Sequence, residues 1–297
     1  MSDINETMIK IGTCIPGNSA EQWLAPMADV GFETASINFH MKYSGVDVAK
    51  QGPVLRELAE SKGIQITTLG YYCNPLISEE HRKNLEYAID HAALYGAERV
   101  ATFAGGVEGK SVPESMERFG EVFGELCRRA EDKGLKLVIE NCPMGGTWRH
   151  VTCNIGFCPK AWEMMFDAVP SDVLGLEWEP AHQMTQLIDP LPQLRKWVKK
   201  VYHLHGKDAT VDWQAVRENG YYVENFVENR TPGFGDTNWR DVFYILMRNG
   251  YRGDICVEGY HDPIYSGALE MTGQIHALHY LQWCRGGKTY PPNPWDK

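Results

Sequence analysis

The chain has 297 residues, of which 43% are hydrophobic, enough to build one large domain or two smaller ones. Its formal net charge is −10 at pH 7, whereas a nucleic-acid-binding protein normally carries a basic face. No apolar run approaches the length of a membrane span, and the first residues, MSDINETMIKIG, lack the features of a signal peptide. We therefore expect a cytoplasmic protein that acts on small molecules, with neither nucleic acid nor a membrane as its partner.

The eight cysteines are scattered and include no CxxC pair. The closest two, Cys153 and Cys158, have a spacing that fits neither a common zinc site nor a redox motif. In a reducing compartment such residues are packed thiols, so the sequence predicts no structural disulfide.

The chain alternates short β-rich runs with longer amphipathic stretches. The predicted strands are 9–14, 32–39, 64–72, 99–105, 135–141, 173–179, 201–207 and 254–260. The predicted helices are 19–30, 48–62, 78–96, 112–133, 159–169, 190–199, 238–249 and 265–284. A glycine follows several of these helices just before the next strand, as is typical of a helix stop.

Eight strand–helix repeats in a chain of this length predict an α/β fold, a single-domain (β/α)8 TIM barrel over residues 1–285. The proline-rich remainder, 286–297, is expected to be a C-terminal tail. A doubly wound sheet is the alternative, but no GxGxxG motif follows the first strand. The longest connection, 208–237, follows the seventh strand and is interpreted as a lid or specificity loop.

Four acid or imidazole side chains stand at the ends of four successive predicted strands: Glu140, Glu179, His205 and Glu258. In a barrel they converge on one mouth, where three carboxylates repel one another unless a cation lies among them. A single glutamate at a strand end is more often a surface or salt-bridged residue, but four in succession favour a metal site. One divalent ion is expected, Mn²⁺ first, with Mg²⁺, Co²⁺ or Zn²⁺ as alternatives. Glu177 is predicted to lie deeper and to pair with a lysine, arginine or histidine.

Four stretches carry a family resemblance: VIENCPMGG, LGLEWEPAHQ, VYHLHGKDA and ICVEGYHDP. They resemble the motifs of the xylose isomerase-like superfamily, also called the sugar phosphate isomerase/epimerase family, and the resemblance covers nearly the whole chain. It implies that Glu140, Glu179, His205 and Glu258 hold one divalent metal, and that Glu140 and Glu258 are the catalytic pair. The family usually has Asp where this chain has Glu179. The extra methylene extends that carboxylate by about 1.5 Å and indicates a specialised subgroup.

Six further residues are predicted to bind substrate. His182 resembles a family histidine that contacts substrate, although a histidine at a helix start is often only a cap. Lys207 is expected to point inward like His205, and Arg230 precedes a glycine-rich turn on the long connection. The remaining candidates stand on loops or at strand ends, where ordinary packing is an equal or better explanation: Trp148, Tyr71 and His40.

The leading functional hypothesis is a metal-dependent isomerase or epimerase of keto-sugars, which abstracts a proton next to a carbonyl through an enediolate. Its main rival is a lyase or dehydratase that acts on 3-keto-glycosides or related keto-sugars by β-elimination, including deglycosylation. An endonuclease of the same barrel family would need more histidines and a basic groove, and a binding-only barrel would not need four convergent ligands. No strong phosphate-binding signature is present. The resemblance also raises a homodimer or homotetramer as a partner arrangement.

Overall fold

A computed structural model describes residues 9–222 and 226–286, so the predicted tail lies outside the described residues apart from Gly286. Eight parallel strands form a closed barrel in the order β1-β10-β7-β6-β5-β4-β3-β2, which confirms the predicted fold class. The barrel strands are β1 (Lys10–Pro16), β2 (Thr34–His40), β3 (Gln65–Tyr72), β4 (Arg99–Thr102), β5 (Lys136–Glu140), β6 (Leu174–Trp178), β7 (Val201–Gly206) and β10 (Asp254–Val257). Among the described helices, none combines the length and the apolar character that crossing a membrane requires.

Internal contacts divide the chain into two compact units. The N-terminal unit comprises Cys14–Trp178 and Lys200–Leu204, and the C-terminal unit comprises Met1–Thr13, Glu179–Lys199 and His205–Lys297. Strands β1 and β7 contribute residues to both units.

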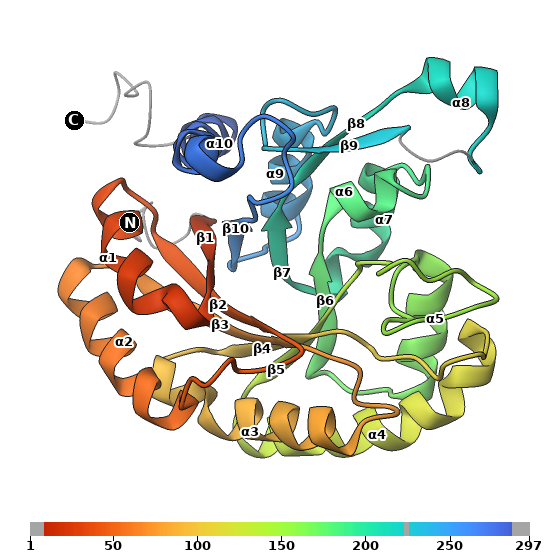
Figure 1. Ribbon diagram of the computed structural model, residues 1–297, viewed down its shortest axis with the longest axis horizontal. Coiled ribbons are helices and arrows are strands. Elements are labelled where there is room, and N and C mark those ends of the chain that lie inside the picture. Colours follow the sequence, from red (N-terminus) through yellow and green to blue (C-terminus); the bar gives the residue numbers. More distant parts are fainter. Residues whose placement is uncertain (1–8, 223–225, 287–297) are drawn as a thin grey trace. The chain divides into compact units, whose positions relative to one another are not determined.

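The N-terminal unit places helices on the outer side of strands β2 to β5 (Figure 1). Its helices are η2 (Gly17–Ser19), α1 (Ala20–Asp29), α2 (Val48–Lys62), α3 (Glu79–Tyr95), α4 (Val112–Asp132) and α5 (Pro159–Ala168). Local sequence fixes their starts. The Ser111 side chain accepts a hydrogen bond from the backbone N–H of Glu114, whose own carboxylate accepts from the backbone N–H of Ser111, forming a capping box before α4. Gly63 ends α2 in the left-handed conformation that glycine adopts without strain.

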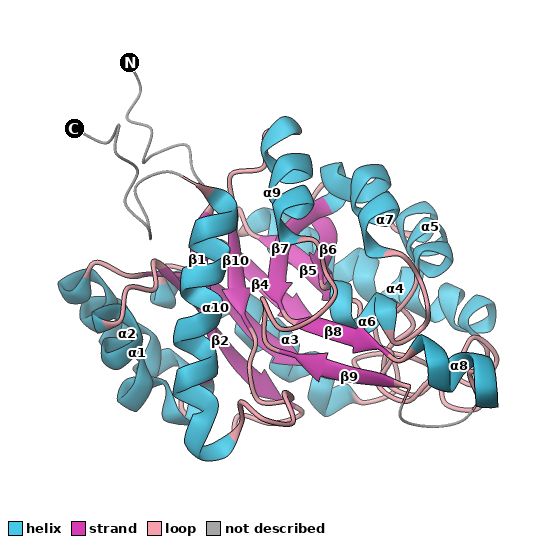
Figure 2. Cartoon of the chain, turned by 90° about the horizontal axis from the view of Figure 1, so that it is seen from above, coloured by secondary structure: helices cyan, strands magenta, loops and turns pink. Residues whose placement is uncertain are grey.

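The C-terminal unit carries the long connection, which is more ordered than a loop. Its elements are α6 (Pro180–Met184), α7 (Pro190–Trp197), β8 (Asp208–Val211), α8 (Trp213–Asn219), β9 (Val227–Arg230), α9 (Trp239–Arg248), η4 (Gly267–Leu269) and α10 (Glu270–Arg285). A further 3-10 turn, η3 (Val198–Lys200), precedes β7. Figure 2 shows β8 and β9 side by side with α8 at one end.

Strands β8 and β9 form an antiparallel hairpin that the sequence did not reveal. Its base is fixed by Asp208, a buried carboxylate that accepts hydrogen bonds from Thr237 N at 3.0 Å and Trp239 Nε1 at 2.9 Å. Burial raises the pKa of Asp208, and these hydrogen bonds oppose the rise. The described residues of this connection, 208–222 and 226–237, therefore include a two-stranded unit that directly follows β7, here called the hairpin arm.

The predicted elements agree with the structure to within a few residues at each end. The largest differences are short elements that follow a strand directly, such as α6, which begins at Pro180 immediately after Glu179. All eight cysteines, each within the described residues, are free thiols.

Candidate metal centre

Glu179 extends strand β6 by one step beyond its last paired residue. Its backbone angles, φ −137° and ψ 123°, are those of a strand, and Pro180 then starts α6. Proline lacks the N–H that would continue the ladder, and its fixed φ suits the first turn of a helix. The local sequence therefore stops the strand at a carboxylate, and that side chain is fully buried.

Glu179, His205 and Glu258 direct ligand atoms toward one another within the C-terminal unit. The Nδ1 atom of His205 lies 3.4 Å from Oε2 of Glu179 and 3.3 Å from Oε2 of Glu258. One ligand atom from each of the three lies within 4.8 Å of the others. His205 is 1% exposed, so this is a water-poor cluster of two carboxylates and one imidazole.

A lysine and a second histidine complete the charge pattern. Lys207, 3% exposed, holds its Nζ 3.5 Å from Oε1 of Glu179 and 3.3 Å from Oε2 of Glu258. His182 Nε2 lies 3.1 Å from Oε1 of Glu179. The structure thus brings together five of the predicted site residues, since Glu179, His182, His205, Lys207 and Glu258 all meet here.

Burial and neighbouring charges shift the pKa values of Glu258 and His182, and so set their protonation states. Burial alone raises the pKa of Glu258, but the Lys207 ammonium and hydrogen bonds from His205 and His261 outweigh it and hold the pKa well below its usual range. Burial lowers the pKa of His182 well below its ordinary value, and the positive charge of Lys207 lowers it further. At neutral pH Glu258 is therefore a carboxylate and His182 a neutral imidazole.

Arg230 ends strand β9 and faces an aspartate on the loop after β10. Its Nε lies 3.5 Å from Oδ2 of Asp262, which also accepts a hydrogen bond from Thr231 N at 2.8 Å. The other oxygen of Asp262 accepts hydrogen bonds from the backbone N–H groups of Ile264 and Tyr265. Asp262 is four residues beyond Glu258, so it ties the hairpin arm to the loop that carries a candidate ligand.

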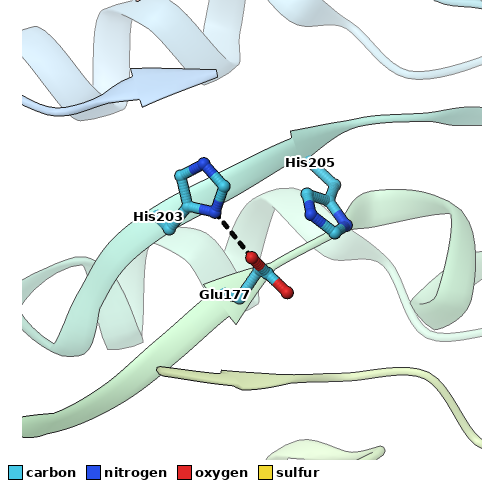
Figure 3. A group of neighbouring side chains, drawn as sticks. All are labelled: Glu177, His203 and His205. Carbon is cyan, nitrogen blue, oxygen red and sulfur yellow. Dashed lines mark hydrogen bonds and ion pairs between the residues drawn. The ribbon is translucent and has the colours of Figure 1, made fainter. Parts of the chain in front are cut away.

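Glu140 belongs to the N-terminal unit, where it is the last residue of β5 and 5% exposed. The parallel register pairs it with Glu177 of β6. Glu177 is fully buried; its Oε1 lies 2.6 Å from Nδ1 of His203, and its Oε2 accepts a hydrogen bond from the Tyr72 hydroxyl at 2.8 Å. Figure 3 shows the Glu177–His203 pair, with His205 two residues farther along β7. The predicted histidine, lysine or arginine partner of Glu177 is therefore confirmed as His203.

The three other predicted substrate-binding residues lie in different surroundings. The Tyr71 hydroxyl donates to Met41 O and accepts from Asn84 Nδ2, both at 3.0 Å, so Tyr71 points toward α3 while Tyr72 takes the opposite face of β3. Trp148 is half-buried on the loop before α5, with Lys160 Nζ 5.3 Å from the centre of its ring. His40 is exposed at the end of β2. Tyr71 and Trp148 are thus engaged in local packing.

Sequence reasoning missed two residues that organise the site. Asp208 and Asp262 are buried carboxylates that bind backbone N–H groups at the base of the hairpin arm, where Asp208 pairs with Arg230. Both stand beside predicted site residues, in GKDA and YHDP, and an aspartate after a strand often binds backbone amides. That signal does not reveal which distant backbone each carboxylate will bind.

The donor set of Glu179, His205 and Glu258 fits a divalent cation. One fully buried and one partly buried carboxylate in mutual reach are stabilised by positive charge, and oxygen ligands with one imidazole suit Mn²⁺, Mg²⁺, Co²⁺ and Zn²⁺. Lys207 supplies one positive charge to the two carboxylates of this cluster.

The sequence profile of the xylose isomerase-like TIM barrel family matches residues 24–281. The chain belongs to this family. An inosose dehydratase of Clostridium perfringens (strain 13 / Type A) is 25% identical to this xylose isomerase-like protein over 288 residues, covering 89% of this chain and 90% of the relative.

Solved structures share the fold at lower identity. A xylose isomerase domain protein from Planctomyces limnophilus aligns with a TM-score of 0.71 at 19% identity, covering 94% of this chain and 98% of its own. An L-ribulose 3-epimerase gives 0.68 at 14% identity, covering 94% and 96%. The 3-keto-D-glucoside 4-epimerase of E. coli gives 0.66 at 16% identity, covering 93% and 100%. These solved structures therefore share the barrel fold of this chain.

Proposed function

We propose that this protein is a divalent-metal-dependent sugar isomerase or epimerase that removes a proton next to the carbonyl of a keto-sugar. The observation that carries the proposal is the buried convergence of Glu179, His205 and Glu258, with Lys207 within 3.5 Å of both carboxylates. A barrel with such a cluster at its strand ends is suited to chemistry in which negative charge develops on substrate oxygens.

Glu140 is proposed as the fourth ligand. It ends its strand as a buried carboxylate, as Glu179 does at β6, and its motif resembles that of the family. Mn²⁺ is the preferred ion, by the mixture of oxygen donors and one imidazole. The cation would polarise the substrate carbonyl and lower the pKa of the neighbouring C–H.

Glu140 and Glu258 are proposed as the catalytic pair, in which one carboxylate takes the proton and the other returns it to the opposite face or the neighbouring carbon. Glu258 suits the role of base because its low pKa keeps it ionised. Glu179 and His205 orient the site. Lys207 and His182, on either side of Glu179, are proposed to bind substrate oxygens, and Arg230 is proposed to bind a more distant part of the substrate.

A lyase is the second candidate, because the sequence relatives that span 89–94% of this chain include inosose dehydratases. The first step is the same, but the enediolate then expels a β-oxygen substituent in place of accepting a proton. The Lys207 ammonium, 3.3 Å from the Glu258 carboxylate, provides a positive charge that can stabilise a departing oxygen.

The decisive experiment is deuterium exchange. The Mn²⁺-loaded protein is incubated in D₂O with inosose, D-fructose or a 3-keto-D-glucoside, and NMR follows deuterium at the carbon next to the carbonyl. Exchange with return of an isomer identifies the isomerase or epimerase, and exchange with loss of water or of the aglycone identifies the lyase.

Glu140→Gln and Glu258→Gln should each slow exchange by at least about a hundredfold, the scale of a lost acid–base catalyst. Glu121→Gln, which changes an exposed surface carboxylate on α4, is the matched control and should exchange like the wild type. Equal exchange in Glu258→Gln and in the control would rule out the proposed catalytic pair.

A further inference from the structure

One row of residues crosses the N-terminal unit at the carboxyl ends of its strands. The register pairs His40 with Tyr72 and Glu140 with Glu177. Phe103 links the two pairs: its ring lies 5.3 Å from that of Tyr72, and β4 and β5 stay paired up to the residue before Phe103 and Glu140. Residues that are in register on neighbouring parallel strands point their side chains to the same face of the sheet. The row therefore runs from three aromatic rings to the proposed catalytic carboxylate, Glu140.

The rings of His40, Tyr72 and Phe103, at one end of this row, pack against one another. The His40 and Tyr72 rings are 4.7 Å apart at an interplanar angle of 14°, and His40 also lies 6.4 Å from Phe103. Tyr72 and Phe103 are each 1% exposed, whereas His40 is exposed, so the imidazole stands at the solvent edge of the stack. The hydrogen bond from the Tyr72 hydroxyl to Glu177 fixes the ring on which His40 lies.

Three sulfur-containing side chains pack against a cluster that includes two rings of this stack. Met41, Cys142 and Cys153 are partly buried against the cluster that contains Tyr72 and Phe103. Met41 adopts φ 59°, a left-handed conformation that is uncommon for a residue with a side chain and that is held only where the surroundings demand it. Thioethers and thiols pack favourably against aromatic rings, so the rim is apolar and polarisable.

The length of the row exceeds that of one sugar. Neighbouring strands are about 4.8 Å apart, so His40 is about 14 Å along the sheet from Glu140, three strands away. A single pyranose ring spans about 5 Å, by ordinary carbon–carbon bond lengths. A ligand that contacts both His40 and Glu140 therefore needs a second ring beside the sugar.

We propose that His40, together with Met41, Cys142 and Cys153, forms a binding site for the aromatic aglycone of a glycoside whose sugar ring lies toward Glu140. The inference rests on the proposed function for the identity of the reacting end, and it names the substrate class: keto-glycosides that carry an aryl group. It applies equally to epimerisation of the sugar and to elimination of the aglycone.

Two stable glycosides test the site without turnover. Isothermal titration calorimetry measures the affinity of the purified protein for 4-nitrophenyl β-D-glucopyranoside and for methyl β-D-glucopyranoside. The wild type should bind the nitrophenyl glycoside about tenfold more tightly. His40→Ala should reduce this ratio about three- to tenfold, the scale of one aromatic contact, while His40→Phe should retain it. Trp23→Ala, which removes another exposed aromatic residue of the same unit, should leave the ratio unchanged.

Equal affinity for the two glycosides, binding of neither, or a ratio that survives His40→Ala would overturn the aryl site. Failure of the proposed function has a different signature. If no keto-sugar exchanges deuterium but the nitrophenyl preference remains and depends on His40, the aryl site stands and only the reaction next to it is reassigned. Measuring both glycosides against wild type, His40→Ala, His40→Phe and Trp23→Ala is therefore the experiment that decides the inference.

Discussion

Two strand-end carboxylate environments, one from each unit of this protein, differ in how closely their oxygens are bound. In the C-terminal unit, Glu179 and Glu258 lie near cationic or titratable groups at 3.1–3.6 Å, distances that leave them available to a further cation. In the N-terminal unit, Glu177 is held by His203 at 2.6 Å and by the Tyr72 hydroxyl at 2.8 Å. Glu177 thus has short hydrogen bonds on both oxygens and serves the architecture.

This difference teaches how one residue type acquires two roles. A buried carboxylate with short hydrogen bonds to both oxygens is fixed and costly to disturb, whereas one set among longer ion pairs can exchange them for a metal ion or a substrate oxygen. Spacing along the chain does not distinguish the two, since Glu177 and Glu179 are separated by a single residue.

The largest expected effect comes from breaking the fixed pair. His203→Leu should lower the free energy of unfolding by about 3–5 kcal/mol, because it removes the 2.6 Å partner of a fully buried carboxylate. Tyr72→Phe keeps the ring and loses one hydrogen bond, so about 1–2 kcal/mol is expected. Urea unfolding with EDTA present measures both, and a cost below 1 kcal/mol for His203→Leu would show that this pair is not structural.

The second prediction compares how substitutions in the two units change the stabilisation by Mn²⁺. At about a hundred times its Kd, an ion that binds only the folded chain adds about 2.7 kcal/mol. Mn²⁺ should therefore raise the Tm of the wild type and of Tyr72→Phe by about 5 °C. Glu179→Ala should abolish the shift, and the metal content of this variant, measured by mass spectrometry, should fall from about one ion per chain. A shift that persists in Glu179→Ala would place the ion elsewhere.

A third effect concerns the hairpin arm of the C-terminal unit. Asp262→Asn should weaken the hydrogen bond from Thr231 N and the ion pair with Arg230, so hydrogen exchange in β9 should speed up about tenfold. If Arg230 binds substrate, KM should rise more than kcat falls. Asp241→Asn, in the first turn of α9, is the control, and unchanged exchange in Asp262→Asn would show that the arm is held by other contacts.

The smallest expected effect concerns a partly exposed ion pair on the surface of the N-terminal unit. Arg129 makes two hydrogen bonds to Asp90, at 3.0 and 2.6 Å, and holds the pKa of Asp90 below its usual value of 3.8. Because the folded-state pKa is lowered, the stabilisation is present above about pH 4 and is lost as the pH falls through the folded value. After solvent screening, Asp90→Asn should cost about 0.5 kcal/mol at pH 7. The difference from the wild type, measured by urea unfolding, should shrink below pH 4; a constant difference would contradict it.

The sequence alone determined the barrel and most of its elements. Apolar periodicity, caps and helix-stop glycines are local signals, so α2 was predicted with its observed bounds, Val48–Lys62. Strand-end chemistry located Glu179, His205 and Glu258, because parallel strands of a barrel all present the same end at one mouth. The alternation of side chains also predicted a basic or imidazole partner for Glu177.

The direction of individual side chains and their distant partners were decided by the tertiary structure, because local sequence pattern does not specify them. Alternation places Tyr71 and Tyr72 on opposite faces of β3, but only the packing of α3 against Tyr71 and of Glu177 against Tyr72 decides which ring faces inward. The strands β8 and β9 are four residues each, too short to show a clear period, and their pairing depends on Asp208 binding backbone far along the chain. Periodicity is a property of neighbouring residues and was readable; partners 29 to 105 residues apart are set by folding, and were not.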